Sequence, residues 1–430
     1  MPKMVDNLTF NIQFCIILMV IKMEKIYRRE EYLKKIRGFY KDDMIKVITG
    51  IRRCGKSYFL KSVIEELKED GIHEKDIIHI ELDKKEYQNV TTPEKLSKII
   101  DEKITDNDYK YLFIDEIQNV KGYEKIINSY REEGNVSIFL TGSNSCLLSG
   151  ELATKLTGRY IEIEMMPLNF YEYVDMKKFL GKNVNENIYR EFEEYIRNGG
   201  FPKSLYYDEY DEKIIYTTNV IDQIFEKDIK ANNKIKDKYT FEIVEKYIIN
   251  NFGAILSIKN IYNYLQGEKI NIDRRTIKRY LDILEKAKIL YPCDLFDIKS
   301  KRVLKGEKKY YLADLSIYYA MNTDNRINYG PVLENVMFSY LKAKKYNLSV
   351  GYIGALECDF IARKNYDDYY YIQVSKDISS KETEEREYKP FYKIKDMYPR
   401  YLFTLDLLTQ KRDGIHHENI VDFIIENKEL

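Results

Sequence analysis

The chain has no tryptophan, and among its 430 residues only eight are prolines, five are cysteines and four are histidines. With 19 glycines, 44% hydrophobic residues and 14% aromatic residues, this composition argues against a disordered or fibrous chain. The cysteines are scattered without a CxxC pair, and the few histidines do not complete a metal-binding pattern with them. The composition therefore argues against a disulfide scaffold and against structural zinc, and it is typical of a soluble globular protein.

The chain also lacks net charge, because 70 lysines and arginines balance 70 aspartates and glutamates. A nucleic acid or an anionic membrane would therefore have to be bound by a local patch. The apolar run 14–21 is shorter than the roughly 20 residues that cross a bilayer, and no secretory cleavage site follows it. We interpret residues 1–22 as an extension upstream of a translation start at Met23, with an anchor to a membrane or partner as the alternative. A cytoplasmic protein is expected.

Short apolar runs alternate with charged, helix-compatible segments in the first part of the chain. Strands are predicted at 44–49, 77–82, 111–115, 136–141 and 160–164, and helices at 58–68 and 93–105. Strands and helices that alternate at these lengths predict an α/β fold, in which a parallel sheet is covered by helices on both faces.

A loop between the first strand and the first helix fits the phosphate-binding pattern GxxxxGK[ST] at every fixed position. Its glycines let backbone N–H groups turn toward phosphate oxygens, and the positive end of the next helix adds to the attraction. Lys56 is predicted to reach the β- and γ-phosphates, and Ser57 to ligate Mg²⁺. Arg52 and Arg53 either add charge to the pocket or make contacts between domains. The predicted nucleotide contacts are Gly50, Ile51, Arg52, Arg53, Cys54, Gly55, Lys56, Ser57 and Tyr58.

Two carboxylates, Asp115 and Glu116, follow an apolar run at the predicted carboxyl end of a strand. Open α/β sheets bind their ligands at that edge. Asp115 is predicted to hold Mg²⁺, and Glu116 to orient or deprotonate the attacking water, which favours hydrolysis over simple binding. The next strand ends in the small polar segment 141–144, which is placed to sense a γ-phosphate or that water.

Several segments occur in a fixed order: GIRRCGKS, FIDEIQNV, FLTGSNSCLLSGE, LTGRY, MPLNFYEY and NGGFPKSL. From Met23 to the end, the chain resembles a family of prokaryotic AAA+ ATPases that carry a C-terminal region of unknown function. The resemblance implies that this is a P-loop NTPase that uses ATP and Mg²⁺. The residues that it implies for nucleotide, metal, water and sensor are Lys56, Ser57, Asp115, Glu116 and either Ser143 or Asn144.

Two further positions keep alternatives open. Arg159 is predicted either to act in trans on the nucleotide of a neighbouring subunit, as an arginine finger does, or to pair with Glu151 or Glu162. The segment ending at Pro202 is similar to a Gly-x-Pro element that packs against the base in related NTPases, and a helix terminator is its alternative reading.

After Pro202 the sequence changes to longer amphipathic helices, predicted at 239–250, 258–265 and 273–288. Strand-like runs at 289–296 and 309–313 follow, joined by the basic loop 299–302. Three helices and a basic hairpin predict a winged helix-turn-helix. Its third helix is predicted either to contact DNA or to form a solvated or protein-binding face. The basic residues of that helix are Arg274, Arg275, Lys278 and Arg279.

The last hundred residues resemble the PD-(D/E)xK nuclease core, which is an α/β, restriction-endonuclease-like domain. Glu334 lies on a predicted helix, Glu357 and Asp359 lie at the start of a predicted strand, and Gln373 lies on the next strand. Asp359 and Gln373 match the metal-ligand positions of this core. However, the lysine position holds Ser375, and Lys376 falls on the opposite face of the strand. We therefore predict a degenerate module that does not cut nucleic acid, covered by a helix in the segment 378–397.

The sequence thus predicts a Mg²⁺-dependent AAA+ ATPase whose nucleotide state repositions a winged helix and a nuclease-like module. The alternatives are a nucleotide-dependent binding switch with little turnover and a DNA nuclease licensed by ATP. The predicted partners are ATP, DNA through the winged helix and further copies of the chain, without a membrane. The predicted units are an extension (1–22), an ATP-binding domain (23–165), a helical connector (166–205), a winged-helix domain (206–325) and a nuclease-like domain (326–430).

Overall fold

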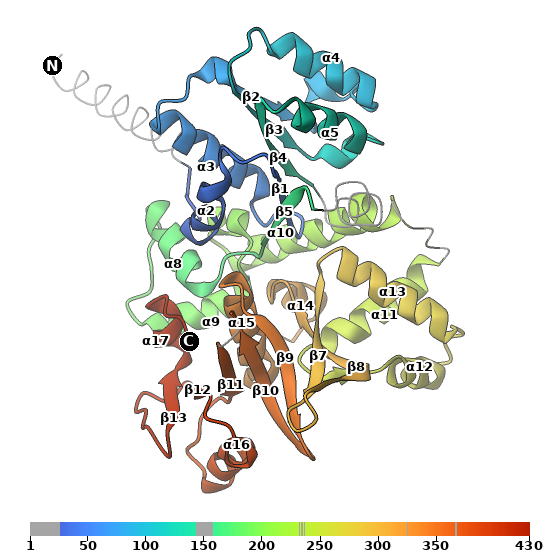
Figure 1. The fold of residues 1–430 in the computed structure, drawn as a ribbon. Coiled ribbons are helices and arrows are strands. Elements are labelled where there is room, and N and C mark those ends of the chain that lie inside the picture. Colours follow the sequence, from blue (N-terminus) through green and yellow to red (C-terminus); the bar gives the residue numbers. More distant parts are fainter. Residues whose placement is uncertain are drawn as a thin grey trace, which may run out of the picture.

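The computed structural model describes residues 26–142, 158–231, 233, 235, 237–324, 326–365 and 368–430. In Figure 1 the chain first builds an upper lobe around one sheet, then a layer of helices, and finally a lower lobe around a second sheet. The predictions for residues 1–22, Ser143, Asn144 and Glu151 fall outside the described residues. Within the described ranges, no helix combines the length and the apolar character needed to span a membrane.

The upper sheet has five strands, in the order β2-β3-β4-β1-β5, and all of its neighbouring strands run parallel. This arrangement confirms the predicted parallel sheet. Because β4 lies between β1 and β3, the carboxyl ends of these three strands meet at one edge. The strands are β1 (Ile45–Gly50), β2 (Ile77–Glu81), β3 (Lys110–Asp115), β4 (Val136–Thr141) and β5 (Tyr160–Met165).

Helices cover both faces of the upper sheet. Ile48 on β1 packs with the apolar side chains of α3 (Lys56–Glu69), whereas Val47 joins a separate cluster under α4 (Pro93–Lys103) and α5 (Glu124–Glu133). Successive side chains of a strand point to opposite faces, so a strand buried on both sides must be apolar almost throughout. This requirement explains why the apolar runs of the sequence located the strands.

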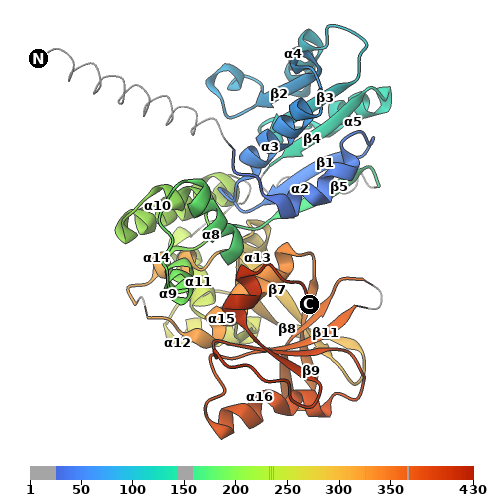
Figure 2. The ribbon, with the colours of Figure 1, turned by 90° about the vertical axis from the view of Figure 1, so that its left-hand side faces the viewer.

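A layer of helices follows the upper sheet, and in both views α8 and α10 lie between the two lobes (Figures 1 and 2). α8 begins with a capping box: Glu172 N donates to the Asn169 side chain at 3.0 Å, and Asn169 N donates to Glu172 at 3.1 Å. The elements of the layer are α8 (Phe170–Phe179), α9 (Ile188–Asn198), the 3₁₀ helix η5 (Pro202–Tyr206), α10 (Tyr210–Gln223) and the π-helix η6 (Ile224–Lys230). The helix α2 (Glu30–Ile36) precedes the upper sheet in the chain and packs against β5.

The next segment contains the predicted three helices and hairpin, with a short additional strand. The Asp273 side chain accepts hydrogen bonds from Arg275 N at 2.8 Å and Thr276 N at 2.9 Å, so it caps the N-terminus of the third helix. The elements are α11 (Lys238–Asn250), β6 (Ile255–Leu256), α12 (Ile258–Gly267), α13 (Arg274–Lys286), β7 (Leu290–Asp297) and β8 (Arg302–Leu312).

The lower sheet has eight strands, in the order β13-β12-β11-β10-β9-β7-β8-β6. The hairpin β7–β8 belongs to it, because β7 pairs with β9 in parallel. One sheet therefore runs across residue 325, where the sequence suggests a boundary between two units. Its remaining strands are β9 (Asn347–Ile353), β10 (Leu356–Arg363), β11 (Tyr369–Val374), β12 (Arg400–Thr404) and β13 (Ile415–Asn419).

Helices pack on this sheet and close the lower lobe. Tyr388 and Phe391 of α16 form a cluster with Tyr371 and Leu402 of the sheet, which confirms a covering helix within the predicted segment 378–397. The helices of the lower lobe are α14 (Ser316–Met321), α15 (Tyr329–Ala343), α16 (Lys381–Lys393) and α17 (Ile420–Ile425). The upper lobe also contains four short 3₁₀ turns: η1 (Arg37–Phe39), η2 (Glu74–Asp76), η3 (Lys85–Tyr87) and η4 (Ile117–Asn119).

Candidate functional site

The predicted phosphate loop lies between the end of β1 and the start of α3. Gly50 has φ 141° and Gly55 has φ 109°, backbone conformations that favour glycine. A side chain at Gly50 would also collide with the carbonyl oxygen of Met165. The first N–H groups of α3 receive no side-chain cap, so they remain available to an anion at the helix N-terminus. The loop therefore offers backbone donors, as a phosphate site requires.

The side chains of the loop are arranged around this backbone. Lys56 is buried, and its Nζ donates to Gly50 O at 3.0 Å and to Ile51 O at 3.3 Å, so its ammonium lies inside the loop. Ser57 is half-buried, and Tyr58 on the next position is exposed. Burial raises the pKa of the Cys54 thiol, which makes this cysteine a packing residue of the loop rather than a reactive one.

The predicted acidic pair lies at the same edge of the sheet, at the end of β3. Asp115 is buried, and Thr141 at the end of β4 donates its hydroxyl to Asp115 Oδ1. The same hydroxyl accepts Glu116 N at 3.0 Å. Glu116 has φ 58°, a left-handed conformation that is strained for a side-chain-bearing residue, and Gln118 Nε2 donates to its carboxylate. Thr141 therefore positions both acids, a role that the sequence analysis missed although this residue opens the polar segment 141–144.

Both arginines of the phosphate loop contact the helical layer below the upper sheet. Arg52 forms a two-pronged ion pair with Asp228 of η6, at 2.8 Å from Nε and 2.9 Å from Nη2. Arg53 Nη2 donates to Gln223 Oε1 at 3.2 Å at the end of α10. Of the two readings of these arginines, the structure favours contacts between different parts of the chain.

A residue before the first helix also holds the loop, and no sequence pattern pointed to it. The guanidinium of Arg29 is buried and donates to Cys54 O at 3.3 Å and to Met166 O at 2.6 Å. It also pairs with Glu172 of α8 at 2.6 Å. Arg29 thus ties the phosphate loop to the end of the upper sheet and to the helical layer.

Pro202 lies against the loop, since a Cβ atom built on Gly55 would be 3.7 Å from its ring. The preceding Gly200 is enclosed: its N–H donates to Asp314 Oδ2 at 2.7 Å, and its carbonyl accepts Leu168 N at 2.7 Å. Asp314 is fully buried, and burial raises its pKa to about 6. The segment 200–202 at the start of η5 therefore connects the phosphate loop to the lower lobe.

Arg159 precedes β5, at the edge of the sheet opposite the phosphate loop. Its Nη1 donates to Asn128 Oδ1 at 2.9 Å and lies 3.5 Å from Glu132 of α5. Pairing with Glu162 is not observed, because that carboxylate instead accepts Thr49 Oγ1 at 2.6 Å. Arg159 is therefore placed away from the phosphate loop of its own chain.

The basic residues predicted on α13 are exposed on one helix. None of the four forms an ion pair within 4.0 Å among the described residues, although hydrogen bonds from Thr276, together with the charge of Arg275, lower the pKa of the nearby Asp273. Two of them lie over aromatic rings: Arg274 is 4.9 Å from the ring centroid of Tyr262, and Arg279 is 5.6 Å from that of Tyr280. Arg275 and Lys278 are the other two.

The acids predicted in the lower lobe surround a lysine that the sequence analysis missed. Lys309 of β8 places its Nζ at 2.9 Å from Glu334 Oε2 and at 2.6 Å from Glu357 Oε1. Tyr311 OH donates to the same Glu334 oxygen at 2.8 Å. These contacts neutralise the carboxylates from within the chain.

Asp359 and Gln373 are likewise engaged with the protein. Asp359 N donates to Gln373 Oε1 at 2.7 Å, and Val374 N donates to Asp359 Oδ2 at 2.8 Å. Gln373 Nε2 in turn donates to Glu387 of α16 at 3.0 Å. Burial and the nearby charge of Glu334 raise the pKa of Asp359 well above its usual value.

The metal-binding geometry of a nuclease is not evident in this cluster. Among the described residues, the one group of three acids close enough to share an ion is Asp76, Asp106 and Asp108 in the upper lobe. Lys376 lies 5.2 Å from the ring centroid of Tyr329, and Ser375 Oγ donates to Asp377 O at 3.3 Å. The chain thus places no lysine at the position that the nuclease pattern reserves for it.

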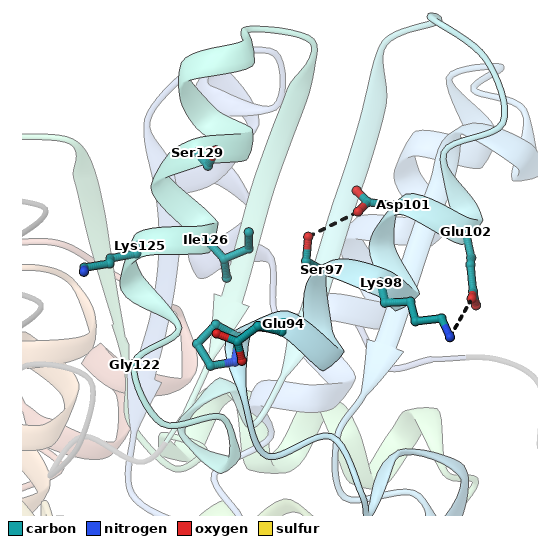
Figure 3. A pocket seen from close by; sticks show the side chains of 10 residues that line it. Glu94, Ser97, Lys98, Asp101, Glu102, Gly122, Lys125, Ile126 and Ser129 are labelled. Atoms are coloured by element: carbon teal, nitrogen blue, oxygen red, sulfur yellow. Dashed lines mark hydrogen bonds and ion pairs between the residues drawn. The ribbon is translucent and has the colours of Figure 1, made fainter.

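A groove of about 860 Å³ lies between α4 and α5, and Figure 3 shows its lining side chains. Ser97 Oγ donates to Asp101 at 3.2 Å, and Lys98 lies 4.0 Å from Glu102. These helices cover the face of the sheet opposite α3. The groove is therefore separate from the phosphate loop. Its Asp101 also accepts Tyr130 OH of α5 at 2.5 Å, which joins the two helices.

Comparison with known proteins gives a consistent result. A family profile described as "AAA domain" matches residues 42–174, which contain the loop and both acids, and a "Domain of unknown function" profile matches residues 189–327. An uncharacterised protein of Haemophilus influenzae is 36% identical over 401 residues, which cover 93% of this chain and 98% of that protein. An uncharacterised protein of Methanocaldococcus jannaschii is 29% identical, over 96% of this chain and 90% of that protein.

Among solved structures, a Walker-type ATPase of Pyrococcus abyssi aligns with 70% of this chain and 96% of its own length. The sequence identity is 16%, and the TM-score is 0.49.

Proposed function

The chain belongs to a family of AAA-domain proteins that includes the Haemophilus influenzae relative, and from this premise we propose that it binds ATP with Mg²⁺ and hydrolyses the γ-phosphate. The observation that carries the proposal is the meeting of two features at one edge of the upper sheet. A glycine-dependent loop ends in an uncapped helix, and one strand away Thr141 holds an acidic pair.

Each group at this edge has a role in the proposal. Backbone N–H groups of the loop and the Lys56 ammonium bind the phosphates, while the Ser57 hydroxyl and the Asp115 carboxylate are hard oxygen donors that suit Mg²⁺. When bound, the ion would neutralise charge that develops on the phosphate oxygens. Glu116 orients and deprotonates the attacking water, and its backbone is fixed by Thr141. Asn144 or Ser143 would sense the γ-phosphate.

Phosphate release and calorimetric ATP binding test this proposal. Lys56→Ala is expected to weaken binding, and Glu116→Gln to retain binding while turnover falls. Lys61→Ala is a matched control, because this lysine lies on the same helix and pairs with Glu81 at 3.0 Å instead of lying in the loop. If the wild-type protein binds ATP but releases phosphate at the rate of Glu116→Gln, the protein is a nucleotide-dependent switch with little turnover. If it binds no adenine nucleotide, the proposal is wrong.

We propose that Arg159 acts in trans, because it lies at the edge of the sheet away from its own loop. Separately, we propose that Tyr58 and Pro202 border the nucleotide next to the phosphate loop.

A mass measurement with and without ATP tests whether subunits assemble, as the role of Arg159 in trans requires. A monomer under both conditions would contradict the role of Arg159.

The α13 face supports nucleic-acid binding as a second candidate function. Arg275 and Lys278 are exposed and form no close ion pair within the described chain, which leaves their charged groups accessible to phosphates. In a salt titration with duplex DNA, the double variant Arg274→Ala, Arg275→Ala is expected to reduce the slope of log affinity against log salt by about two. An unchanged slope would indicate a protein partner for this winged-helix-like segment.

We further propose that the nuclease-like module does not cut. Lys309 holds Glu334 and Glu357, and Gln373 is engaged with Asp359 and Glu387, so these groups are satisfied within the protein. Incubation with plasmid, ATP and Mg²⁺ or Mn²⁺ should leave the DNA intact. Nicking that disappears in Asp359→Ala would instead establish an ATP-licensed nuclease.

A further inference from the structure

The contact between the phosphate loop and η6 has features of a switch rather than of a simple anchor. Arg52 and Asp228 are both largely buried, with 11% and 5% of their side chains exposed. The guanidinium uses two N–H groups on the two carboxylate oxygens, a geometry that phosphate oxygens can satisfy equally well. Arg52 is therefore a group for which a carboxylate and a nucleotide phosphate are alternative partners.

Arg52 lies between the phosphate loop and η6. It belongs to the loop that is proposed to enclose the phosphates. Burial would lower its pKa, but the hydrogen bonds and charge of Asp228, with a smaller contribution from Glu116, hold that pKa above its usual value. The guanidinium of Arg52 thus interacts electrostatically with Asp228 of η6 and also with Glu116, the acid that is proposed to activate water.

The element that carries Asp228 is unusual in its backbone. η6 is a π-helix over Ile224–Lys230, and such segments are rare and occur frequently at functional sites. If Arg52 leaves Asp228, η6 loses the two-pronged ion pair that joins it to the phosphate loop, and breaking an ion pair between largely buried groups is costly unless the segment rearranges. Departure of Arg52 therefore favours a rearrangement of η6.

A chain of ring contacts continues from η6 to the basic helix. Phe225 of η6 packs on Phe241 of α11, with 5.6 Å between ring centroids, and Phe241 packs edge-on against Tyr280 of α13 at 5.0 Å. Arg279, one of the exposed cations of α13, lies over the Tyr280 ring. A shift of η6 is thus transmitted by direct packing to the surface that we propose for nucleic acid.

We propose that Asp228 and the phosphates of bound ATP compete for Arg52, so that ATP binding releases η6 and repositions α13. This inference rests on the proposed function, because it assigns a regulatory connection to the same nucleotide site. Asp228 is a positioning residue in it, since it acts through Arg52 and does not touch the nucleotide.

Calorimetry with a non-hydrolysable ATP analogue and Mg²⁺ tests the competition in four proteins: wild type, Asp228→Asn, Arg52→Ala and the double variant. Asp228→Asn is expected to bind the analogue about tenfold more tightly and Arg52→Ala about tenfold more weakly, as expected for one charge-assisted contact. In the Arg52→Ala background, Asp228→Asn should have no effect. Glu191→Gln is a matched control, because its buried ion pair with Lys177 joins α8 and α9 away from the loop.

Two results would overturn the proposal. Weaker binding by Asp228→Asn would show that Asp228 merely supports the loop. Tighter binding that persists without Arg52 would show a general charge effect on the phosphates. Failure of the wild-type protein to bind the analogue at all would refute the proposed function itself, and it is distinguished from the other results because all four proteins would then behave alike.

Hydrogen exchange gives a readout that a purely structural role would not change. Adding the analogue should speed exchange of the amides in 224–230 severalfold in the wild-type protein and leave it unchanged in Arg52→Ala. Equal exchange with and without the analogue in the wild-type protein, despite saturated binding, would contradict release of η6.

Discussion

At the edge of the upper sheet, Lys56 donates to backbone carbonyls of its own loop, whereas in the lower sheet Lys309 donates to Glu334 and Glu357. Both regions bring a buried lysine together with acids and strand ends. They differ in the partners of these groups: the upper site keeps uncapped helix N–H groups, and in the lower site side chains satisfy one another. The first arrangement keeps backbone donors free for a ligand, whereas a ligand of the second would first have to displace side chains from one another.

This difference follows from how each site is made. An anion site built from glycines and a helix N-terminus depends on backbone, so single side-chain changes elsewhere rarely fill it. A metal site built from carboxylates is closed as soon as a cation such as Lys309 reaches it from a neighbouring strand.

The largest expected effect separates the two sites by activity. Glu116→Gln should lower phosphate release by about a thousandfold, equivalent to about 4 kcal/mol, because it removes the base that acts on water. Asp359→Asn should leave phosphate release within twofold of the wild type, since its site takes no part in hydrolysis. Steady-state kinetics at saturating ATP measure both. A comparable loss in Asp359→Asn would show that the two sites work as one.

The second prediction tests whether Lys309 neutralises the acids Glu334 and Glu357 of the lower lobe. Lys309→Met should lower the free energy of unfolding by roughly 3 to 5 kcal/mol, because it leaves Glu334 buried without its cation. Lys308→Met is the matched control: this neighbouring lysine pairs with Asp294 at an exposed site and should change stability by about 1 kcal/mol at most. Urea unfolding followed by circular dichroism gives both values. Equal effects would contradict the proposed neutralisation.

The third prediction uses pH to examine a carboxylate that is held between the two lobes. Burial raises the pKa of Asp314 to about 6, above its value of 3.8 in an unfolded chain. The folded state therefore prefers the protonated form, so this contribution to stability is complete below about pH 4 and is lost as pH rises through about 6. The loss should be about 3 kcal/mol.

The measurement is the unfolding free energy between pH 4 and pH 7, compared for wild type and Asp314→Asn. Asp314→Asn should make the decline about 3 kcal/mol smaller than in the wild type, even if its overall stability is lower. A decline remains in both proteins, because burial raises the pKa of Glu245 to about 8 and this group also titrates in the window. Asp324→Asn is the control, because Asp324 is exposed, Arg326 lowers its pKa to about 2, and its titration lies below this window. An unchanged decline in Asp314→Asn would refute the assignment.

The sequence predicted the upper sheet well, for a physical reason. Strands buried on both faces are continuous apolar runs, and Gly50 and Gly55 mark backbone that other residues would strain. The positions of Asp115 and Glu116 followed from the rule that ligands bind at the carboxyl ends of parallel strands. Thr141 could have been found in the same way, because it is the polar residue that ends the neighbouring strand.

Other parts could not be predicted because they depend on contacts between distant segments. Lys309 reaches Glu334 and Glu357 only because β7 pairs with β9 and joins the hairpin to the lower sheet. Asp228 has no sequence signal, since an aspartate in a charged helix is ordinarily solvated. Its pairing with Arg52 depends on how η6 packs under the upper lobe.

The smallest expected effect is that of replacing Thr141. This change tests whether Thr141 aligns Asp115 and Glu116 or only contributes to packing. Thr141→Val keeps the shape of the side chain but removes the hydroxyl that contacts Asp115 and Glu116 N. We expect a stability loss of about 1 kcal/mol and a fall in kcat of roughly tenfold with little change in KM, because the acids lose their alignment rather than their charge. Thr49→Val is the matched control: Thr49 also lies near a strand end and donates to a carboxylate, that of Glu162, away from the acidic pair. It should lose similar stability and retain kcat, and a matching fall in kcat would mean that the alignment of Asp115 and Glu116 is not what Thr141 provides.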